Sequence, residues 1–386
     1  MSDLKICKLG LWNKSIPGIK FDDQGVSNFA KMQLSLMEQY PRGEMGMANW
    51  ESIVEKMKLD GKGKQYDCII GMSGGTDSSY LLHIAKQYGL RVIAVNLDNG
   101  WSSDIAVKNI KVVTSALNYD LETYVINYEE VIGVLKAYIL ASFPWIDSPT
   151  DIAIKSTLYK IAAREGVKYV LNGSDFRSEG KQPLTWTYSD TKQLKFLVRK
   201  FSPETKLRTY PLQPLSSWIY YGFIRKIKVI RPLYFLPYEK KEAKKLLAEK
   251  YGWIDYGGHH HENIFTKFAI SYWLPEKFGI DKRIITLSAQ VLSGEISREE
   301  AMNQINNPSF NIETIENDIN YVIKKLKLSR EDFEKAFKAE NKFYYDYPSY
   351  YPLFKKFAGI GKTVSMKIFG FGDGVRSRQR HVDATH

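Results

Sequence analysis

Short apolar runs alternate with helix-length segments between residues 67 and 172, and this alternation limits the possible folds more than any other feature of the chain. Strands that alternate with helices of this length form a parallel sheet with helices on both faces. The sequence therefore predicts an α/β protein with a doubly wound parallel sheet. The expected strands are 67–72, 91–97, 122–127 and 167–172, and the expected helices are 78–88, 103–117 and 150–165.

The segments on either side of this alternating core have different patterns. Residues 1–65 contain turn signals and one amphipathic stretch around 50–59. Beyond about residue 190 the chain is aromatic, with helical periodicity that is strongest at 239–251, 298–305 and 312–327. We therefore expect three parts: an N-terminal segment 1–65, an α/β domain 66–190, and a basic, mostly helical region 191–386.

The positive charge is concentrated in one window. The chain has a formal net charge of +12, and residues 191–250 alone hold 15 basic and four acidic side chains. Such a window suits an anionic partner: nucleic acid, an anionic membrane surface or a phosphorylated substrate. A solvated, lysine-rich face is the alternative. The aromatic residues before Arg225 (Trp218, Tyr220, Tyr221 and Phe223) fit either base stacking, a membrane interface or a buried element.

The amino-acid composition indicates the cellular compartment and whether the chain spans a membrane. Two cysteines in 386 residues argue against a disulfide scaffold and favour a reducing compartment. The longest uncharged stretch, 209–224, is shorter than the ~20 residues of a spanning helix and contains two prolines. The N-terminus has no basic segment followed by an apolar run. We expect a soluble cytoplasmic protein that does not span a membrane.

The most specific motif lies between the first expected strand and its helix. Two adjacent glycines let the backbone approach an anion, and the helix N-terminus adds N–H donors and a positive dipole end. The motif lacks the Gly-Lys-Ser/Thr of a Walker A loop and is not a GxGxxG fingerprint. It consists of Ser73, Gly74, Gly75, Thr76, Asp77 and Ser78.

This loop resembles the SGGxDS loop of the PP-loop ATP pyrophosphatases, whose fold is adenine nucleotide alpha hydrolase-like. The resemblance implies ATP cleavage between the α- and β-phosphates, with Mg²⁺ as cofactor and Asp77 as its expected ligand. It also implies that the loop binds ATP together with Asp98 and Gly173. These two residues follow the second and fourth expected strands, on the ligand side of an open α/β sheet.

Three longer stretches, 17–26, 172–188 and 256–283, resemble the N-acetyl sugar amidotransferases of surface polysaccharide (lipopolysaccharide and O-antigen) biosynthesis. The resemblance spans roughly residues 5–305. It implies that ATP and ammonia convert an acetamido group of a nucleotide-linked sugar to an acetamidino group. The candidate catalytic residues are Asp77, Lys181 and Lys267, although both lysines also fit simple surface positions. The candidate substrate contacts are Ser178, Glu179, His260 and Glu262.

The chain departs from this family at its N-terminus. Where the family carries two Cys-x2-Cys pairs, this chain has Cys7, Gly10, Ser27 and Ala30. One thiolate does not complete a four-ligand site, so we expect no structural zinc. The triplet 259–261 of histidines fits substrate or phosphate hydrogen bonding better than a metal site.

The nitrogen source follows from the cysteines. A glutaminase needs a nucleophilic cysteine, but residue 2 is serine, Cys68 lies in an expected buried strand and Cys7 has no elbow-like context. We therefore expect a separate glutaminase subunit to supply ammonia.

Three other functions remain open. A tRNA-modifying enzyme of the lysidine-synthetase type fits the basic window and needs no cysteine. An inactive nucleotide-binding assembly subunit fits the lost cysteines, and an NAD or GMP synthetase-like activity fits the loop alone. On the amidotransferase interpretation the partners are the nucleotide sugar and the glutaminase, and a nucleic acid is not expected.

Overall fold

Five parallel strands form the centre of the protein, in the order β3-β2-β1-β4-β5. The structure is a computed structural model that describes residues 5–257 and 262–358. This sheet confirms the predicted α/β class. The strands are β1 Cys68–Gly71, β2 Val92–Asp98, β3 Asp120–Val125, β4 Tyr169–Leu171 and β5 Lys228–Ile230.

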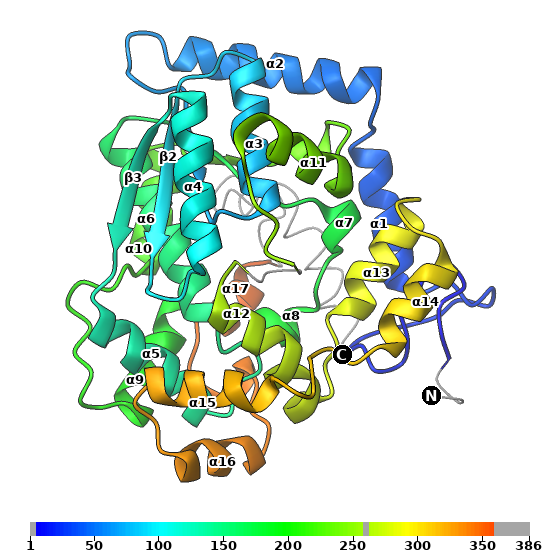
Figure 1. Ribbon diagram of the computed structural model, residues 1–386, viewed down its shortest axis with the longest axis vertical. Helices are drawn as coiled ribbons and strands as arrows, with labels where there is room; N and C mark the ends of the chain where they lie inside the picture. The colour runs from blue at the N-terminus through cyan, green and yellow to red at the C-terminus, as the bar shows by residue number, and fades with distance from the viewer. Residues whose placement is uncertain (1–4, 258–261, 359–386) are drawn as a thin grey trace.

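Helices cover both faces of the sheet (Figure 1). On the central strand, Cys68 and Ile70 belong to one apolar cluster with α3 (Thr76–Gln87) and α4 (Asp104–Leu117). Ile69, between them, packs into a second cluster with α6 (Ser148–Arg164) on the opposite face. Successive side chains of a strand point to opposite faces, so burial on both sides produces a continuous apolar run. The doubly wound arrangement is therefore confirmed.

The expected strands and helices of this core lie within two residues of their observed bounds. One difference matters for the site. The sequence predicted a helix from residue 78, whereas α3 begins at Thr76, which places Asp77 in its first turn. A negative charge there is favoured by the helix dipole. The fifth strand was not expected, because its three residues lie in the basic window and show no apolar alternation.

Beyond residue 190 the chain is mostly helical, as predicted. These helices are α9 Thr191–Phe201, α10 Leu215–Ile219, α11 Lys240–Tyr251, α12 Ile264–Phe268, α13 Arg283–Leu292, α14 Arg298–Asn306, α15 Ile315–Lys325, α16 Arg330–Lys338 and α17 Tyr351–Ala358, with π-helical turns η1 Tyr220–Ile224 and η3 Ala269–Lys277 and short 3-10 turns η2 Pro232–Tyr234 and η4 Tyr344–Asp346. Because β5 comes from this region, the expected domain boundaries stay a prediction.

Two of the remaining helices precede β1, one lies between β3 and α6, and two follow β4. They are α1 Asn28–Gln39, α2 Glu44–Asp60, α5 Tyr128–Leu140, α7 Phe176–Glu179 and α8 Leu184–Thr187. A large apolar cluster combines the N-terminal segment (Trp12, Phe29) with α5 (Tyr138), α9 (Leu197) and η3 (Trp273). Figure 1 shows α1 beside α13, with α15 and α16 at the end of the molecule away from α2. Residues far apart in sequence therefore share one core.

At the N-terminus, hydrogen bonds join three of the four positions where the resembled family carries zinc ligands. The Cys7 thiol accepts the N–H of Ser27 at 3.2 Å, and Ser27 caps α1 by accepting the N–H of Ala30 at 3.1 Å. At Gly10 a Cβ would lie 2.6 Å from the Trp12 ring, so an aromatic side chain takes up that space. Among residues 5–257 and 262–358, no three His, Cys, Asp or Glu side chains are grouped to hold a metal. The absence of zinc stays a prediction.

A search of the described residues finds no helix with the length and apolarity needed to cross a bilayer.

Glu130, near the start of α5, fixes a distant loop. Its buried carboxylate accepts backbone N–H groups of Arg208 at 3.2 Å, Thr209 at 3.0 Å and Tyr210 at 2.7 Å, and also the Thr209 hydroxyl at 3.0 Å. Many donors to one buried acceptor make that acceptor costly to remove.

We predict that Glu130→Ala lowers the free energy of unfolding by about 2–4 kcal/mol, because three backbone donors lose their acceptor. Its neighbour Glu129 lies in the same helical turn and forms an exposed ion pair with Lys327. As the matched control, Glu129→Ala should cost less than about 1 kcal/mol. Urea unfolding of both variants measures the difference, and equal costs would contradict the assigned role of Glu130.

Candidate functional site

The loop 72–75 and the loop after β4 meet at the carboxyl end of the sheet. In the observed strand order, β1 lies between β2 and β4, and the chain connections diverge at the β1–β4 boundary. Open α/β sheets bind ligands at this switch point. The two loops are in contact here, because a Cβ on Gly173 would lie only 3.0 Å from the backbone of Asp77. The sequence motif therefore occupies the position where this fold forms binding sites.

Gly74 is the residue that lets the loop fit against α4. Its φ is +79°, and a Cβ there would lie 2.2 Å from the carbonyl oxygen of Ala106. The Gly74 carbonyl accepts two side-chain donors, Trp253 Nε1 at 3.1 Å and Asn109 Nδ2 at 3.3 Å. The loop backbone is thus held from both sides in one conformation.

Hydroxyls and backbone N–H groups converge within the loop. The Gly75 N–H donates to Ser73 Oγ at 3.2 Å, and the hydroxyl oxygens of Ser73 and Ser78 are 3.3 Å apart. The Thr76 N–H donates to the Tyr256 hydroxyl at 3.2 Å. With the α3 dipole behind them, these groups form a surface suited to phosphate oxygens.

Asp77 is paired with two residues that sequence analysis missed. Its carboxylate accepts a hydrogen bond from the Tyr238 hydroxyl and an ion pair from Lys240 Nζ at 3.3 Å. Burial alone lowers the pKa of Lys240, but the charges of Asp77 and Glu179 outweigh it and raise that pKa overall. Burial and the Asp77 charge raise the pKa of Tyr238. Lys240 therefore stays a cation beside the loop.

A buried charge network supports the second loop. Asp175 caps α7 and pairs with Arg42 at 3.0 Å, while Arg177 donates to the carbonyl oxygens of Tyr40 at 2.6 Å and Tyr234 at 3.1 Å. Burial raises the pKa of Asp175 and lowers that of Arg177 to about 10. Every member has a partner, so the network fixes the backbone next to Gly173 rather than offering reactive groups.

The C-terminal region contributes directly to the loop surroundings. The Glu262 carbonyl accepts the N–H of Ser103 at 2.8 Å, and the Trp101 carbonyl accepts the N–H of Ile264 at 2.9 Å. Glu262 Oε1 lies 3.2 Å from the position of a Cβ on Gly75. Its charge adds to burial in raising the pKa of Tyr256 to about 12. Glu262 therefore lies next to the loop formed by residues 73–78, the phosphate loop, as an expected substrate contact should.

The other expected residues lie in varied settings. Asp98 ends β2 and accepts the N–H of Gly100 at 2.8 Å. Ser178 is buried in α7, with its hydroxyl 3.5 Å from the Asp175 carbonyl oxygen. Lys181 donates to the Tyr234 hydroxyl at 2.6 Å, and Lys267 pairs with Asp318 of α15 at 2.9 Å. Glu179 is the last residue of α7, and its charge contributes to raising the pKa of Lys240. His260 lies outside the described residues.

The structure thus brings together the loop residues, Gly173, Asp77 and Glu262, and it adds Tyr238, Lys240, Trp253 and Tyr256. The sequence signals for the added residues were the helix expected from residue 239 and the resembling stretch that begins at Tyr256. A lysine in the first turn of a helix opposes the helix dipole and is a weak hint that another charge compensates it.

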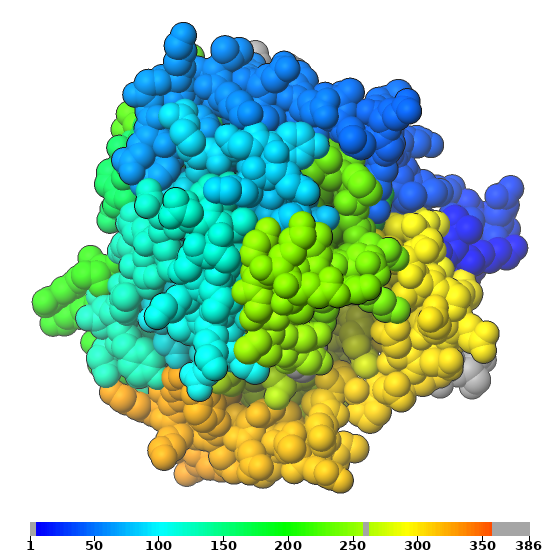
Figure 2. Space-filling view, turned by 45° about the horizontal axis from the view of Figure 1, so that its top comes forward, coloured from blue at the N-terminus to red at the C-terminus, as the bar shows by residue number. Residues whose placement is uncertain are grey.

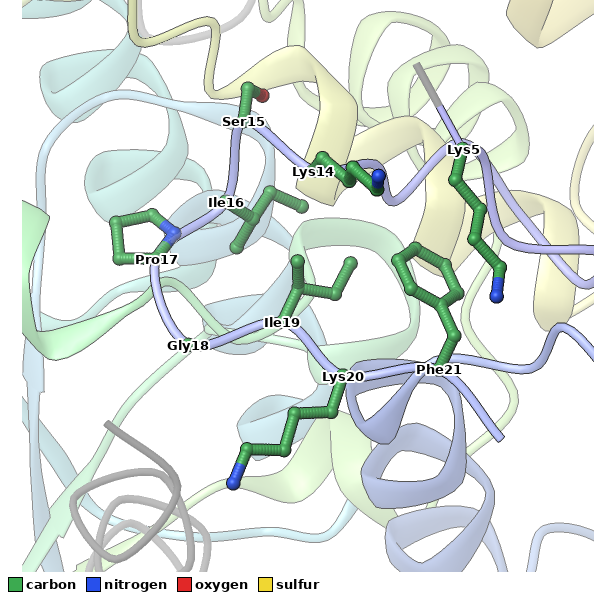
Figure 3. A pocket seen from close by; sticks show the side chains of 9 residues that line it. All are labelled: Lys5, Lys14, Ser15, Ile16, Pro17, Gly18, Ile19, Lys20 and Phe21. Carbon is green, nitrogen blue, oxygen red and sulfur yellow. The ribbon is translucent and has the colours of Figure 1, made fainter. Parts of the chain in front are cut away.

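Figure 2 shows a hollow on the surface between the segment 240–257 (yellow-green), α13 and α14 (yellow) and the orange C-terminal helices. A separate open cavity of about 630 Å³ lies wholly on the N-terminal segment, lined by Lys5 and residues 14–21 (Figure 3). None of the expected site residues lines that cavity.

Comparison with known proteins gives one family match. Residues 262–360 match the family "LPS biosynthesis protein WbpG-like, C-terminal domain". The chain carries a WbpG-like C-terminal domain. The match extends past residue 305, where the resemblance seen in the sequence ended, so it includes the last helices. No curated protein matches the chain.

Several solved structures are similar in part. NMN synthetase from Francisella tularensis is 13% identical, covers 73% of this chain and 96% of its own, and has a TM-score of 0.37. The NH3-dependent NAD synthetase from Campylobacter jejuni is 19% identical, covers 73% of this chain and 98% of its own, and has a TM-score of 0.29. The U34-tRNA thiolase NcsA from Methanococcus maripaludis is 14% identical, covers 71% and 88%, and has a TM-score of 0.30.

We predict that Gly74→Ala destabilises the protein by at least about 2 kcal/mol more than Gly63→Ala, since only the first adds a steric overlap with backbone. Gly63 is the matched control because its φ is +77° and nothing lies within 4 Å of its Cβ position. Thermal and urea unfolding of the two variants test this. Similar losses would show that the contact with Ala106 does not constrain the loop.

Proposed function

We propose that the protein is an ATP-dependent amidotransferase that converts the acetamido group of a nucleotide-linked sugar to an acetamidino group. The observation that carries the proposal is the Ser73–Ser78 loop, which lies at the switch point of the sheet in a chain with a WbpG-like C-terminal domain. The resemblance of this loop to PP-loop pyrophosphatases supplies the type of ATP cleavage.

The reaction has two balanced steps. The acetamido oxygen attacks the α-phosphorus of ATP, an O–P bond forms, and the bond to pyrophosphate breaks. Ammonia then attacks the carbon of the adenylated imidate, AMP leaves, and a proton is released as the amidine forms. An amide carbon is a poor electrophile, and AMP is a far better leaving group than oxide, which explains the need for ATP.

The residues of this chain have separable roles in those steps. The loop N–H groups and the hydroxyls of Ser73 and Ser78 bind phosphate oxygens. Lys240 places a cation beside the loop, where negative charge builds on the departing pyrophosphate. Lys240 is a stronger phosphate-contacting candidate than Lys181 and Lys267, because its partner Asp77 belongs to the loop itself, whereas Lys181 donates to Tyr234 and Lys267 pairs with Asp318.

The Asp77 carboxylate is the type of ligand that Mg²⁺ prefers, and in this structure its two oxygens are engaged by the Tyr238 hydroxyl and by Lys240. Asp77 would hold this ion, which supplies further neutralisation of phosphate charge when bound. Glu179, Glu262, His260 and Ser178 remain proposed substrate contacts. Of these, Glu262 is supported best, by its position at Gly75.

We predict that Asp77→Ala, Ser73→Ala and Lys240→Met each lower ATP-to-AMP turnover about 100-fold or more, because each removes a group that acts on developing phosphate charge. Asp104→Ala is the control, since Asp104 lies in the first turn of α4 and is exposed. Pyrophosphate release measures the effect. Near-normal turnover by a folded Asp77→Ala variant would reject the pyrophosphatase assignment.

The two cysteines support ammonia supply by a partner. Both side chains are buried, and burial raises the pKa of the Cys68 thiol. The Cys7 sulfur accepts a backbone hydrogen bond. A glutaminase nucleophile is an accessible thiolate, which neither residue provides. A separate glutaminase subunit is therefore the proposed nitrogen source.

We predict that the isolated chain forms product with ammonium salts and none with glutamine. Incubation of UDP-acetamido sugars with ATP and magnesium, followed by mass spectrometry, should show a decrease of about one mass unit as oxygen is replaced by NH. Cys7→Ser should retain this activity. Glutamine hydrolysis by the chain alone, lost on substitution of either cysteine, would overturn the two-subunit proposal.

A tRNA-modifying function remains the alternative, favoured by the basic window. Several cations of that window have intramolecular partners, however: Lys240 pairs with Asp77, Lys244 with Asp255, and Arg225 donates to the Ala163 carbonyl. RNA that co-purifies with the protein and stimulates AMP formation would favour this alternative. No ATP turnover under any of these conditions would favour an inactive assembly subunit.

A further inference from the structure

A short helical segment exposes apolar side chains on its outer face. It comprises α10 and η1, residues 215–224, and its outward residues are Ile219, Tyr220, Phe223 and Ile224. Ile224 is 68% exposed. Their spacing of one, three and four residues places them on one side of the helix. Phe223, the least exposed of the four, is 39% exposed.

The opposite side of the segment makes aromatic contacts with neighbouring helices, although no residue of α10 or η1 is fully buried. Tyr221 stacks on Tyr159 of α6, with ring centroids 5.6 Å apart, and Trp218 stacks on Phe354 of α17 at 5.3 Å. Lys155 of α6 lies 4.8 Å over the Trp218 ring. The exposure of the outer face is therefore not a sign of a poorly attached loop. It is the surface of an element that is anchored by its inner aromatic residues.

Cations follow the exposed residues directly. Lys226 and Lys228 are exposed, Arg225 donates to the Ala163 carbonyl, and no Asp or Glu occurs between Thr205 and Tyr238. Apolar side chains with a one-signed basic border match the boundary between acyl chains and anionic headgroups. The bases of a nucleic acid would stack on the aromatic rings, but a nucleic acid has no apolar region that buries the aliphatic side chains of Ile219 and Ile224.

The segment lies away from the candidate active site. Three successive contacts join the segment to α6: Trp218 with Lys155, the Tyr221 ring with the Tyr159 ring, and Arg225 with the Ala163 carbonyl. Because the residue numbers increase together on both sides, the segment runs alongside α6 in the same direction. α6 leads into β4, and its end at Arg164 therefore lies at the amino end of the strands. Ammonia must reach the opposite, carboxyl end. This placement argues against a glutaminase that delivers ammonia from this surface.

We infer that residues 215–228 form a peripheral membrane-binding surface, which rests the protein on a bilayer rich in anionic lipid. Ile219, Tyr220, Phe223 and Ile224 enter the headgroup boundary, and the exposed Lys226 and Lys228 contact the phosphates of the lipids. This inference is independent of the proposed enzymatic function.

The test is flotation of the full-length protein with vesicles of pure phosphatidylcholine and with vesicles of equal parts phosphatidylcholine and phosphatidylglycerol. We expect binding to the anionic vesicles only, and weaker binding at high salt. The double variant Ile219→Ser/Ile224→Ser should lower the partition coefficient at least about tenfold, because it removes the largest exposed aliphatic groups. Lys226→Gln should lower it less, by about threefold to fivefold.

Matched controls keep the result specific. Ile312 is 70% exposed on another part of the chain, so Ile312→Ser should bind vesicles as the unmodified protein does. Lys62→Gln is the corresponding control for charge. Thermal unfolding of every variant should be unchanged, since only exposed side chains are altered. A loss of binding with Ile312→Ser equal to that of the double variant would overturn the inference.

Other occupants give distinguishable results. Absence of binding to anionic vesicles would overturn the inference. If the unmodified protein self-associates in sedimentation experiments and the double variant does not, a second copy of this chain covers the face. If RNA binding, rather than vesicle binding, is lost in Lys226→Gln, the surface serves nucleic acid.

Discussion

The shape of the phosphate loop depends on one carbonyl group, that of Gly74, which is held by Trp253 and Asn109. Asn109 also exchanges two hydrogen bonds with the backbone of Ile254, both at 2.8 Å, and so fixes the segment that carries Trp253 and Tyr256. Tyr256 in turn accepts the Thr76 N–H. The loop, α4 and the segment 253–256 are therefore one cooperative unit. An SGGTDS sequence between a strand and a helix does not fix this loop conformation by itself, because the conformation also depends on α4 and the segment 253–256.

This dependence explains what could be predicted from the sequence and what could not. The four strands and three helices that we expected between 67 and 172 follow local periodicity and were predicted within two residues, whereas α5, Tyr128–Leu140, was not predicted. Periodicity was most informative for β1 and β4, whose apolar side chains are buried, while β3 is largely exposed. The positions of Asp77 and Gly173 followed from the rule that ligand loops lie at the carboxyl ends of strands. Lys240 and Tyr238 could not be found in this way. They reach Asp77 across more than 160 residues of sequence, and no local pattern records that contact.

The basic residues between 191 and 250 have two different physical roles, which the net charge of the segment does not distinguish. Part of it compensates charge inside the protein. Lys240 begins α11, where the helix dipole disfavours a cation, and the neighbouring Asp77 carboxylate offsets that cost. The second part, around Arg225, borders an apolar surface and stays near solvent. A net charge of a segment therefore does not indicate one ligand, because neighbouring cations can face a nucleotide site and a lipid surface separately.

The β-strand that sequence analysis missed links these two roles. β5 pairs only with β4, through Tyr169–Lys228, Val170–Val229 and Leu171–Ile230, and it follows the α10–η1 segment directly. The segment that would contact a bilayer is thus attached to the same sheet whose carboxyl end carries Gly173 and the phosphate loop. Since α10–η1 extends toward the amino end of that sheet, a chain resting on a membrane through this surface directs the loop at the carboxyl end away from the lipid. On the proposed function, nucleotide, sugar substrate and an ammonia-supplying partner would approach from the aqueous side, and membrane attachment and catalysis would not compete for the same surface.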